Sequence, residues 1–167
     1  HKLPLLHSAF PGTPWIFIYR NPIEVLVSQL RSPGKFALPG GMTPAMLAMD
    51  FDDITNLSRE EWCARVLAGF CRAALRFRAA RNGLCVNYNQ LPVAVWTALA
   101  PHCAITFSAN EVTRMREAAN RDAKRPALRF QPDAHGKQRE ATPSIHALAA
   151  SLLTPLYREL ESWRGAW

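Results

Sequence analysis

The sequence predicts an α/β fold in which helices flank a parallel sheet. Two short runs, at residues 14–19 and 84–88, are dominated by apolar, β-branched and aromatic side chains, a pattern typical of buried strands in parallel sheets. Helical patterns alternate with these runs, as in proteins that connect parallel strands through helices. Because 49% of the residues are hydrophobic and 20% are charged, the composition is that of a globular protein. We therefore expect the 167 residues to belong to a single domain.

The first strand is expected to lead directly into a helix. Residues 14–19 (PWIFIY) are followed by Asn21 and Pro22, which are favoured at the N-cap and at the first position of a helix. Glu24 then lies in the first turn, where a negative charge interacts favourably with the helix dipole. The helix should end near Arg31, and its apolar stripe consists of Ile23, Leu26, Val27 and Leu30.

A long irregular segment and a long helix should follow. Residues 32–57 are rich in Gly, Pro and Met and favour a loop with one short helix at 44–50. Loops of this length often cover binding sites, and Met side chains adapt to apolar ligands, so we expect this loop to line a binding pocket. Ser58 and Glu61 have the spacing of a capping box, which predicts a helix to about residue 81. Its inward face should carry Trp62, Val66, Phe70, Ala73 and Phe77.

After the second strand, at 84–88, the sequence predicts mostly helices. Ser108 is expected to cap one of them, and Thr142 followed by Pro143 should begin the last. Residues 121–142 are polar and basic, so we expect a loop there. The other predicted elements are helices at 92–99, 110–120 and 143–163 and a short extended piece at 104–107.

Two strands are too few for a stable parallel sheet that is covered by helices. Because no third strand is evident, we expect the chain to be the C-terminal part of a larger α/β domain whose first strand lies before His1. The strand at 14–19 would then have an unpaired edge, which an N-terminal segment or a second chain would complete.

The net charge of +7 comes mainly from two arginine-rich blocks. Residues 58–82 carry six basic and two acidic side chains, and residues 111–141 carry eight and five, which gives +4 and +3. Arginine suits two-pronged binding of phosphate or sulfate, although a solvated basic surface is the ordinary alternative. The sequence has no zinc finger, basic zipper or ribonucleoprotein motif, so we do not expect nucleic acid as a partner.

The cysteines and the apolar stretches favour a cytoplasmic protein. None of the four cysteines lies in a C-x-x-C pair or at zinc-finger spacing, so we expect free thiols, a reducing compartment and no metal site. The charge-free stretches at 3–19 and 82–110 contain Pro, and the second also contains Asn and His, which are costly in lipid. We therefore expect no membrane span.

The clearest candidate for ligand binding is the segment that begins with Arg20. This arginine follows the C-terminal end of the first strand, where open α/β sheets bind ligands, and the next helix directs free N–H groups to the same place. Ser28 lies about two helical turns further. An arginine fork and a hydroxyl fit a terminal phosphate. A salt bridge for Arg20, and a bond from Ser28 to its own helix, are the purely structural alternatives.

Residues 10–31 (FPGTPWIFIYRNPIEVLVSQLR) resemble the 3′-phosphate-binding segment of the PAPS-dependent sulfotransferases. That family has a strand, the motif R-[ND]-P, and a helix with Ser eight residues after the Arg. The resemblance implies that Arg20 and Ser28 hold the 3′-phosphate of PAPS, 3′-phosphoadenosine-5′-phosphosulfate. The family's fold is a P-loop-like parallel sheet flanked by helices.

Three further segments are similar to parts of this family. His1 and Lys2 precede Leu-Pro, as a catalytic His or Lys often does there, which implies that one of them is the catalytic base. The run VNYNQL resembles a family strand end whose Tyr approaches the adenine, which implies this role for Tyr88. FQPDAHGK resembles the late basic loop that closes over the nucleotide phosphates, which implies phosphate contacts for Gly136 and Lys137.

The resemblance implies transfer of a sulfuryl group from PAPS to a hydroxyl of a small-molecule or carbohydrate acceptor, without a metal ion. One departure is clear, because the sequence lacks the loop with Lys and Ser or Thr that holds the 5′-phosphosulfate in this family; we expect this loop before His1. The alternatives are a P-loop kinase-like phosphotransferase, a non-catalytic module that binds a nucleotide or a partner protein, and a basic nucleic-acid-binding domain.

Overall fold

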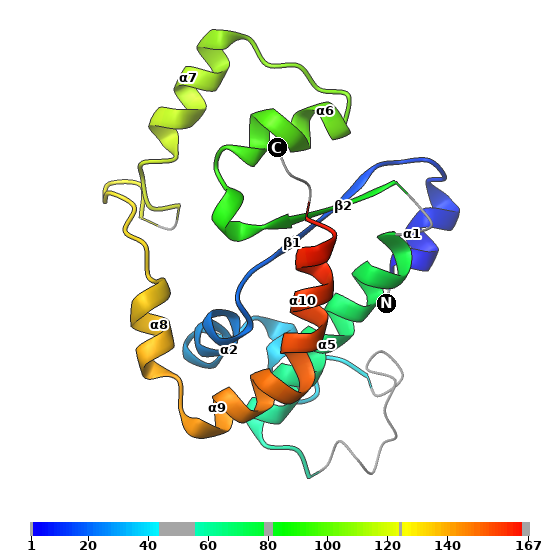
Figure 1. Cartoon of the computed structure of the whole chain (residues 1–167), viewed down its shortest axis with the longest axis vertical. Coiled ribbons are helices and arrows are strands. Elements are labelled where there is room, and N and C mark those ends of the chain that lie inside the picture. Colours follow the sequence, from blue (N-terminus) through cyan, green and yellow to red (C-terminus); the bar gives the residue numbers. More distant parts are fainter. Residues whose placement is uncertain (1, 44–55, 79–81, 124, 165–167) are drawn as a thin grey trace.

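The computed structural model describes residues 2–43, 56–78, 82–123 and 125–164, in which helices surround a small parallel sheet (Figure 1). Strand β1 (Trp15–Tyr19) pairs with β2 (Gly83–Asn87) in a register that runs from Trp15 opposite Gly83 to Tyr19 opposite Asn87. The two predicted strands and their parallel arrangement are confirmed. This mixed, helix-rich architecture is compatible with the α/β class.

The first half of the chain follows the predicted helices closely. Helix α1 (Leu3–Ala9) precedes β1, and α2 (Pro22–Arg31) follows it. The Asn21 side chain caps α2 by accepting a hydrogen bond from the N–H of Ile23 at 3.0 Å. Helix α5 (Arg59–Arg78) begins with the predicted capping box, in which Ser58 and Glu61 bond reciprocally. Local capping bonds thus set where both helices start.

Only part of the long segment at 32–57 can be compared with its prediction. It contains the short helix η1 (Lys35–Ala37), which α5 anchors because Nε1 of Trp62 donates to the carbonyl of Phe36 at 3.1 Å. The short helix predicted at 44–50 and the predicted end of α5 at residue 81 lie outside the described residues.

Two predictions for the region after β2 were wrong in detail. Helical turns η2 (Tyr88–Gln90) and η3 (Val95–Leu99) lead into α6 (Ala100–His102), so the helix predicted at 92–99 starts and ends later. The piece predicted as extended at 104–107 does not begin as extended chain, because Ala104 has a φ of 54°. The N–H of Ile105 closes the helix end by donating to the carbonyl of Ala100 at 2.8 Å.

Helix α7 (Ala109–Ala118) begins at the predicted cap Ser108, which forms a capping box with Glu111. The polar stretch at 121–142 was predicted as a loop, but it contains helix α8 (Ala134–Glu140), so that prediction was wrong. A short polar helix of this kind depends on tertiary contacts. Helix α8 packs on α2, where Glu140 pairs with Arg31.

The last helix is one helical stretch with a wider turn in its middle. Its parts are α9 (Pro143–Leu148), the turn η4 (Ala149–Leu153) and α10 (Thr154–Ser162), and Thr142 caps its start as predicted. Pro155 has no N–H to donate, which explains why the regular pattern breaks here. The Thr154 hydroxyl donates to the carbonyl of Ala149 at 2.9 Å instead.

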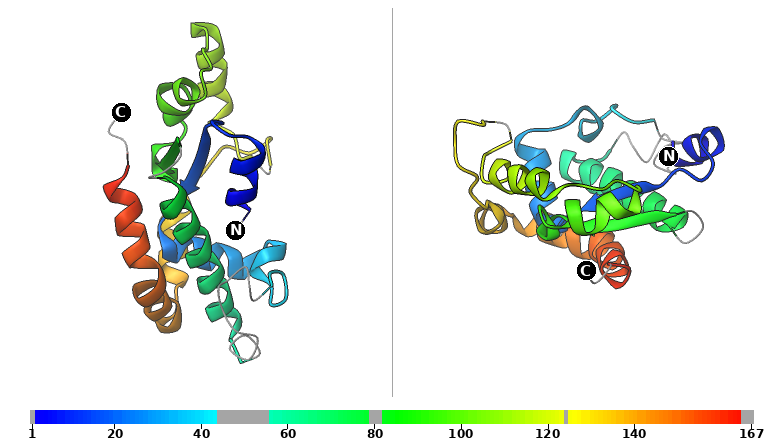
Figure 2. Two further views of the ribbon diagram at one scale, coloured as in Figure 1. Left: turned by 90° about the vertical axis from the view of Figure 1, so that its right-hand side faces the viewer. Right: turned by 90° about the horizontal axis from the view of Figure 1, so that it is seen from above.

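The core lies where α2, α5, α9 and η4 meet, and α6 and α7 lie together at the opposite end of the molecule (Figures 1 and 2). Phe17 and Tyr19 of β1 face α5 and α10, whereas Ile18 points to the other side of the sheet and is 50% exposed. The prediction of a buried strand therefore does not hold at Ile18. The central core residues are Leu26, Val27, Ala37, Cys63, Ala64, Ala68, Ile145, Ala149 and Leu153.

Candidate anion-binding site

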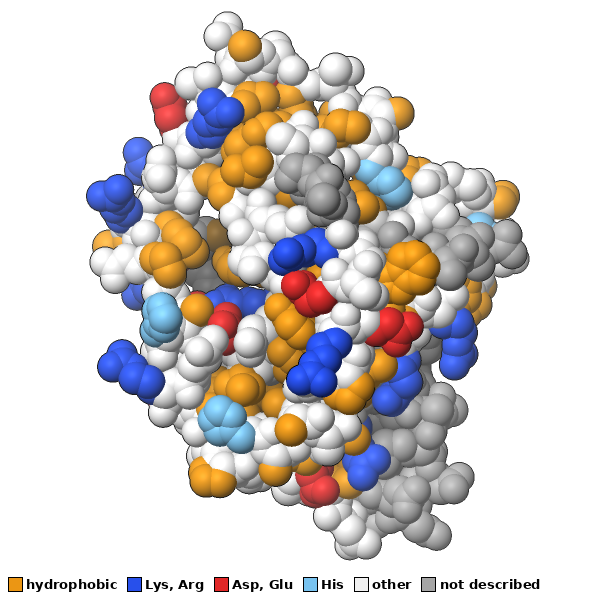
Figure 3. Space-filling model, in the orientation of Figure 1, with side chains coloured by type: hydrophobic (Ala, Val, Ile, Leu, Met, Phe, Trp, Pro, Cys, Tyr) orange, Lys and Arg blue, Asp and Glu red, His pale blue; other side chains and the backbone are white. Residues whose placement is uncertain are grey.

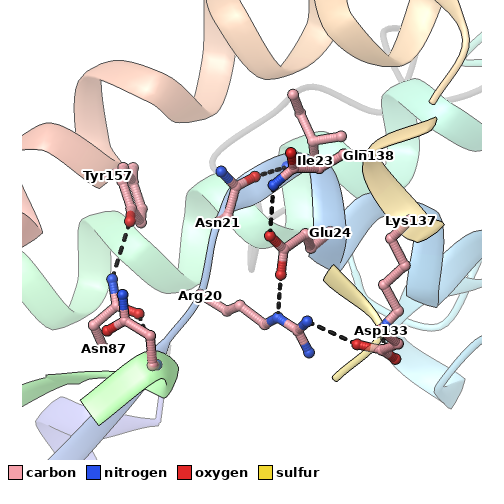
Figure 4. A network of polar contacts seen from close by, with 10 residues as sticks. Arg20, Asn21, Ile23, Glu24, Asn87, Asp133, Lys137, Gln138 and Tyr157 are labelled. Atoms are coloured by element: carbon pink, nitrogen blue, oxygen red, sulfur yellow. Dashed lines mark hydrogen bonds and ion pairs between the residues drawn. The ribbon is translucent and has the colours of Figure 1, made fainter. Parts of the chain in front are cut away.

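Arg20 lies at the junction between β1 and α2, as the sequence predicts. Its Nε donates to Oε2 of Glu24 at 2.5 Å, one helical turn further along the chain (Figure 4). Glu24 is only 6% exposed, and its other carboxylate oxygen accepts a hydrogen bond from Nε2 of Gln138 at 2.8 Å. The beginning of α2 thus fixes the Arg20 guanidinium through a buried carboxylate.

Helix α8 adds a second cation to this junction. Nη2 of Arg20 donates to Oδ1 of Asp133 at 2.8 Å, and Nζ of Lys137 lies 2.7 Å from Oδ2 of the same carboxylate (Figure 4). Asp133 is the N-cap residue of α8, and Lys137 lies one turn later. One carboxylate therefore bridges two cations that come from opposite halves of the chain.

The burial of these groups is uneven. The side chains of Lys137 and Arg20 are only 9% and 20% exposed, whereas that of Asp133 is 54% exposed. Partial burial alone would raise the pKa of Asp133, but hydrogen bonds from Lys137 and Arg20 outweigh it and lower this pKa. Burial would likewise lower the pKa of Arg20, and the bonds to Asp133 and Glu24 raise it instead. Asp133 and Arg20 are therefore both ionised at neutral pH.

Tyr88 completes the cluster on the side of the sheet. It is the first residue of η2, directly after β2, and its ring centre lies 4.6 Å from Cζ of Arg20. The ring is 38% exposed, so a flat ligand could stack beside the guanidinium. Asn87, the N-cap of η2, accepts a hydrogen bond from the N–H of Asn89 at 3.1 Å and so fixes the turn that carries Tyr88.

An apolar cavity of about 260 Å³ lies next to the cluster, with Arg20 and Tyr88 in its lining. Its walls come from β1, α2, α5, η4 and α10, and the side chains that line it include Phe17, Val25, Leu67, Phe70, Cys71, Leu153, Tyr157 and Leu160. The site thus combines two cations, an aromatic ring and an apolar recess.

Most of the predicted nucleotide-binding residues lie at or near this cluster. Arg20, Tyr88 and Lys137 come together, and Ser28 is half-buried one turn beyond Glu24, on the side of α2 that faces α8. Gly136 lies beside Lys137 on α8.

Lys2, the one predicted catalytic residue that the structure describes, is not part of this cluster. Lys2 is exposed before α1, which lies where β1 begins, whereas α2 and α8 lie where β1 ends (Figure 1). His1 is outside the described residues. The structure therefore does not bring Lys2 to the anion site.

Three members of the cluster were not predicted as site residues from the sequence: Glu24, Asp133 and Gln138. Two of them carry a sequence signal, because Glu24 follows Arg20 by four residues and Asp133 precedes Lys137 by four. Opposite charges at this spacing pair on a helix surface. Gln138 has no such signal, since its partner Glu24 is 114 residues away in the sequence.

A second polar network holds α10 against the ends of both strands. The Tyr19 hydroxyl donates to Oε1 of Glu161 at 2.6 Å, and Nδ2 of Asn87 donates to the same oxygen at 2.7 Å and to the Tyr157 hydroxyl at 3.0 Å. Burial, and then the hydrogen bond to Glu161, raise the pKa of Tyr19, so its hydroxyl keeps its proton. This network supports Asn87 immediately before Tyr88.

We expect Tyr19→Phe to lower the free energy of unfolding by about 2 kcal/mol, because it removes a hydrogen bond to a carboxylate. Tyr157→Phe is the matched control, since its hydroxyl accepts from the neutral Asn87 amide, and it should cost about 1 kcal/mol or less. Urea unfolding of the three proteins measures both effects. Equal stability of Tyr19→Phe and the wild type would show that the network does not hold α10.

No protein-family model, curated protein or solved structure matches this chain. Within the described ranges, no helix has both the length and the apolar character needed to cross a membrane. Because no relative indicates a ligand, the ligand of this site is inferred from the residues of the chain itself.

Proposed function

We propose that this chain binds the 3′-phosphate end of PAPS and forms the 3′-phosphate-binding part of a sulfotransferase. The observation that carries the proposal is the Asp133 carboxylate, which lies between Arg20 and Lys137 and contacts both at hydrogen-bond distance. A carboxylate in this position is an intramolecular substitute for a bound anion. A phosphate has more oxygens and more charge to offer the same two donors.

The surrounding residues favour a nucleotide over a free anion. The Tyr88 ring beside Arg20 provides a surface for a base, and Ser28 provides a hydroxyl on the neighbouring face of α2. Among the described residues on the face shown in Figure 3, basic side chains are spread among acidic and apolar ones and form no continuous basic surface. A compact ligand fits this distribution better than a nucleic-acid backbone does.

In this proposal the chain's own residues bind and orient PAPS, which supplies the sulfuryl group for transfer to an acceptor hydroxyl of a small molecule or carbohydrate. Arg20 and Lys137 hold the 3′-phosphate, and Tyr88 lies beside the adenine. Such positioning is a large part of catalysis in group transfer between phosphate-like centres.

The sheet favours a contribution from further polypeptide. Among the described residues, β1 pairs only with β2, so its other edge has no partner strand. The 50% exposure of Ile18 also leaves part of one face of this strand uncovered. We propose that a further segment, or a second chain, extends this sheet to the P-loop-like fold and supplies the loop for the 5′-phosphosulfate. The acceptor would then bind beside that loop.

The proposal is tested by comparing two nucleotides that differ only in the 3′-phosphate. Adenosine 3′,5′-bisphosphate should bind at least about tenfold more tightly than adenosine 5′-monophosphate, because only the first can contact Arg20 and Lys137 through a 3′-phosphate. Isothermal calorimetry with the whole chain measures both affinities. Equal affinities would contradict the assignment.

One alternative has a specific observation in its favour. The sequence lacks a phosphosulfate loop, which would suit a non-catalytic module that binds the nucleotide without turnover. Nucleotide binding does not distinguish this module from the enzyme. Turnover after addition of the proposed further polypeptide would distinguish them, since only the sulfotransferase would consume PAPS.

A further inference from the structure

Asp133 has a place in the cluster that the phosphate site does not require. It is the only acidic residue among the described contacts of Lys137. It also accepts a hydrogen bond from Nη2 of Arg20, whereas Nε of the same guanidinium donates to Glu24. Its side chain is 54% exposed, whereas those of the two cations are 9% and 20% exposed. A ligand that approaches from solvent therefore meets the carboxylate before it meets either cation.

We propose that Asp133 is a built-in competitor for the phosphate ligand and sets the affinity of the site. This inference rests on the proposed function. In the closed state the Asp133 carboxylate occupies the donors of Arg20 and Lys137, and in the open state a phosphate group replaces it there.

The charge balance explains why a phosphate monoester can win this exchange. Arg20 and Lys137 contribute two positive charges, and Glu24 and Asp133 contribute two negative ones, so the closed cluster is neutral. Glu24 is 6% exposed and also bonded to Gln138, so it remains on Arg20. Asp133 can move into water. Its single charge is then replaced by a phosphate dianion, whose attraction to the same cations is greater.

The position of Asp133 in the chain permits this movement. It lies at the N-cap of α8, but its side chain makes no capping hydrogen bond to the helix. Leaving the cations therefore costs Asp133 no bond to the backbone of α8. Helix α8 itself remains attached to α2 through Gln138 and through the pair between Glu140 and Arg31.

The arithmetic of competition sets the size of the effect. The apparent dissociation constant equals the intrinsic one divided by the fraction of open sites. If the closed state outweighs the open one by about ten to one, removing the competitor tightens binding about tenfold. We therefore expect Asp133→Asn to bind adenosine 3′,5′-bisphosphate about tenfold more tightly than the wild type.

Two matched variants separate competition from a general change in charge. Glu140→Gln removes the same charge from the same helix, and its 51% exposed side chain pairs with Arg31 outside the cluster, so it should change the affinity less than twofold. Asp133→Glu keeps the charge and should not tighten binding. Because Asp133 is exposed, Asp133→Asn should fold; if thermal unfolding shows otherwise, Asp133→Ser serves in its place.

Binding titrations of these variants test the competitor role of Asp133 separately from the proposed phosphate site. If wild type and Asp133→Asn bind equally, and Arg20→Ala does not bind, the phosphate site stands and the competitor role is overturned. If none of the variants binds the nucleotide, both inferences are overturned. Tighter binding by Asp133→Asn, with Glu140→Gln unchanged, supports both.

A second measurement follows Asp133 itself. Carbon-detected NMR of the carboxyl group gives its pKa with and without adenosine 3′,5′-bisphosphate. Displacement removes the bonds from Lys137 and Arg20 that lower this pKa, so the nucleotide should raise it toward the ordinary Asp value. An Asp133 pKa that stays low when the site is saturated would overturn the proposal.

Discussion

Arg20→Ala is expected to weaken the binding of adenosine 3′,5′-bisphosphate by about 30-fold or more, which corresponds to about 2 kcal/mol. The substitution removes a guanidinium that can donate two parallel, charge-assisted hydrogen bonds to the phosphate. It also leaves Glu24 buried without its cation, so the free energy of unfolding should fall by about 3 kcal/mol. Calorimetry and urea unfolding measure the two effects separately.

Two controls keep these effects apart. Arg31→Ala removes the same side chain from the other end of α2, where its pair with Glu140 is half-exposed on both sides, so it should change binding and stability little. The double variant Arg20→Ala, Glu24→Gln should recover much of the lost stability, because no buried charge is left unpaired. It should not recover binding. Wild-type affinity in a folded Arg20→Ala protein would remove Arg20 from the site.

The chain of 167 residues by itself is expected to show no sulfotransferase turnover. The sequence contains no loop with Lys and Ser or Thr at the spacing that would hold the 5′-phosphosulfate. Charge that develops on the leaving phosphate would therefore lack prearranged donors, and each such donor typically contributes about 10²-fold or more to the rate. The test is incubation with PAPS and a panel of alcohol, phenol and carbohydrate acceptors.

This experiment needs proof that the protein is competent to bind. The same preparation should bind adenosine 3′,5′-bisphosphate, so that inactivity cannot be attributed to unfolded protein. Robust turnover by the chain alone would show that the phosphosulfate site is already present and that the sheet needs no further polypeptide. Turnover only after addition of the proposed further segment would favour the enzyme over the non-catalytic module.

Local signals explain how much of the fold could be predicted. The starts of α2, α5 and α7 depend on capping bonds between residues two or three positions apart, at Asn21, Ser58 and Ser108, and such signals are visible in sequence. The exposure of Ile18 could not be predicted, because an all-apolar strand does not reveal which face is covered. Helix α8 was missed because a short polar helix has no apolar periodicity to reveal it and depends on its packing against α2.

The site was predictable where a motif carries it. Arg20 could be proposed from its place between a strand and a helix N-terminus. Tyr88 could be proposed only because its segment resembles a strand end of the sulfotransferase family. The ion pair between Arg20 and Asp133 could not be predicted, because it joins residues 113 positions apart and depends on how α8 packs against α2. Sequence patterns can therefore suggest the cations of this site, but only the tertiary structure shows the carboxylate between them.

The most direct test of this account is a crystal structure of the chain with adenosine 3′,5′-bisphosphate. We predict that oxygens of the 3′-phosphate lie within hydrogen-bond distance, about 3 Å, of the Arg20 guanidinium and the Lys137 amine. The adenine should lie beside Tyr88, and the Asp133 carboxylate should have left both cations. A nucleotide bound elsewhere, or one that presents its 5′-phosphate to Arg20 while Asp133 stays in place, would contradict the account.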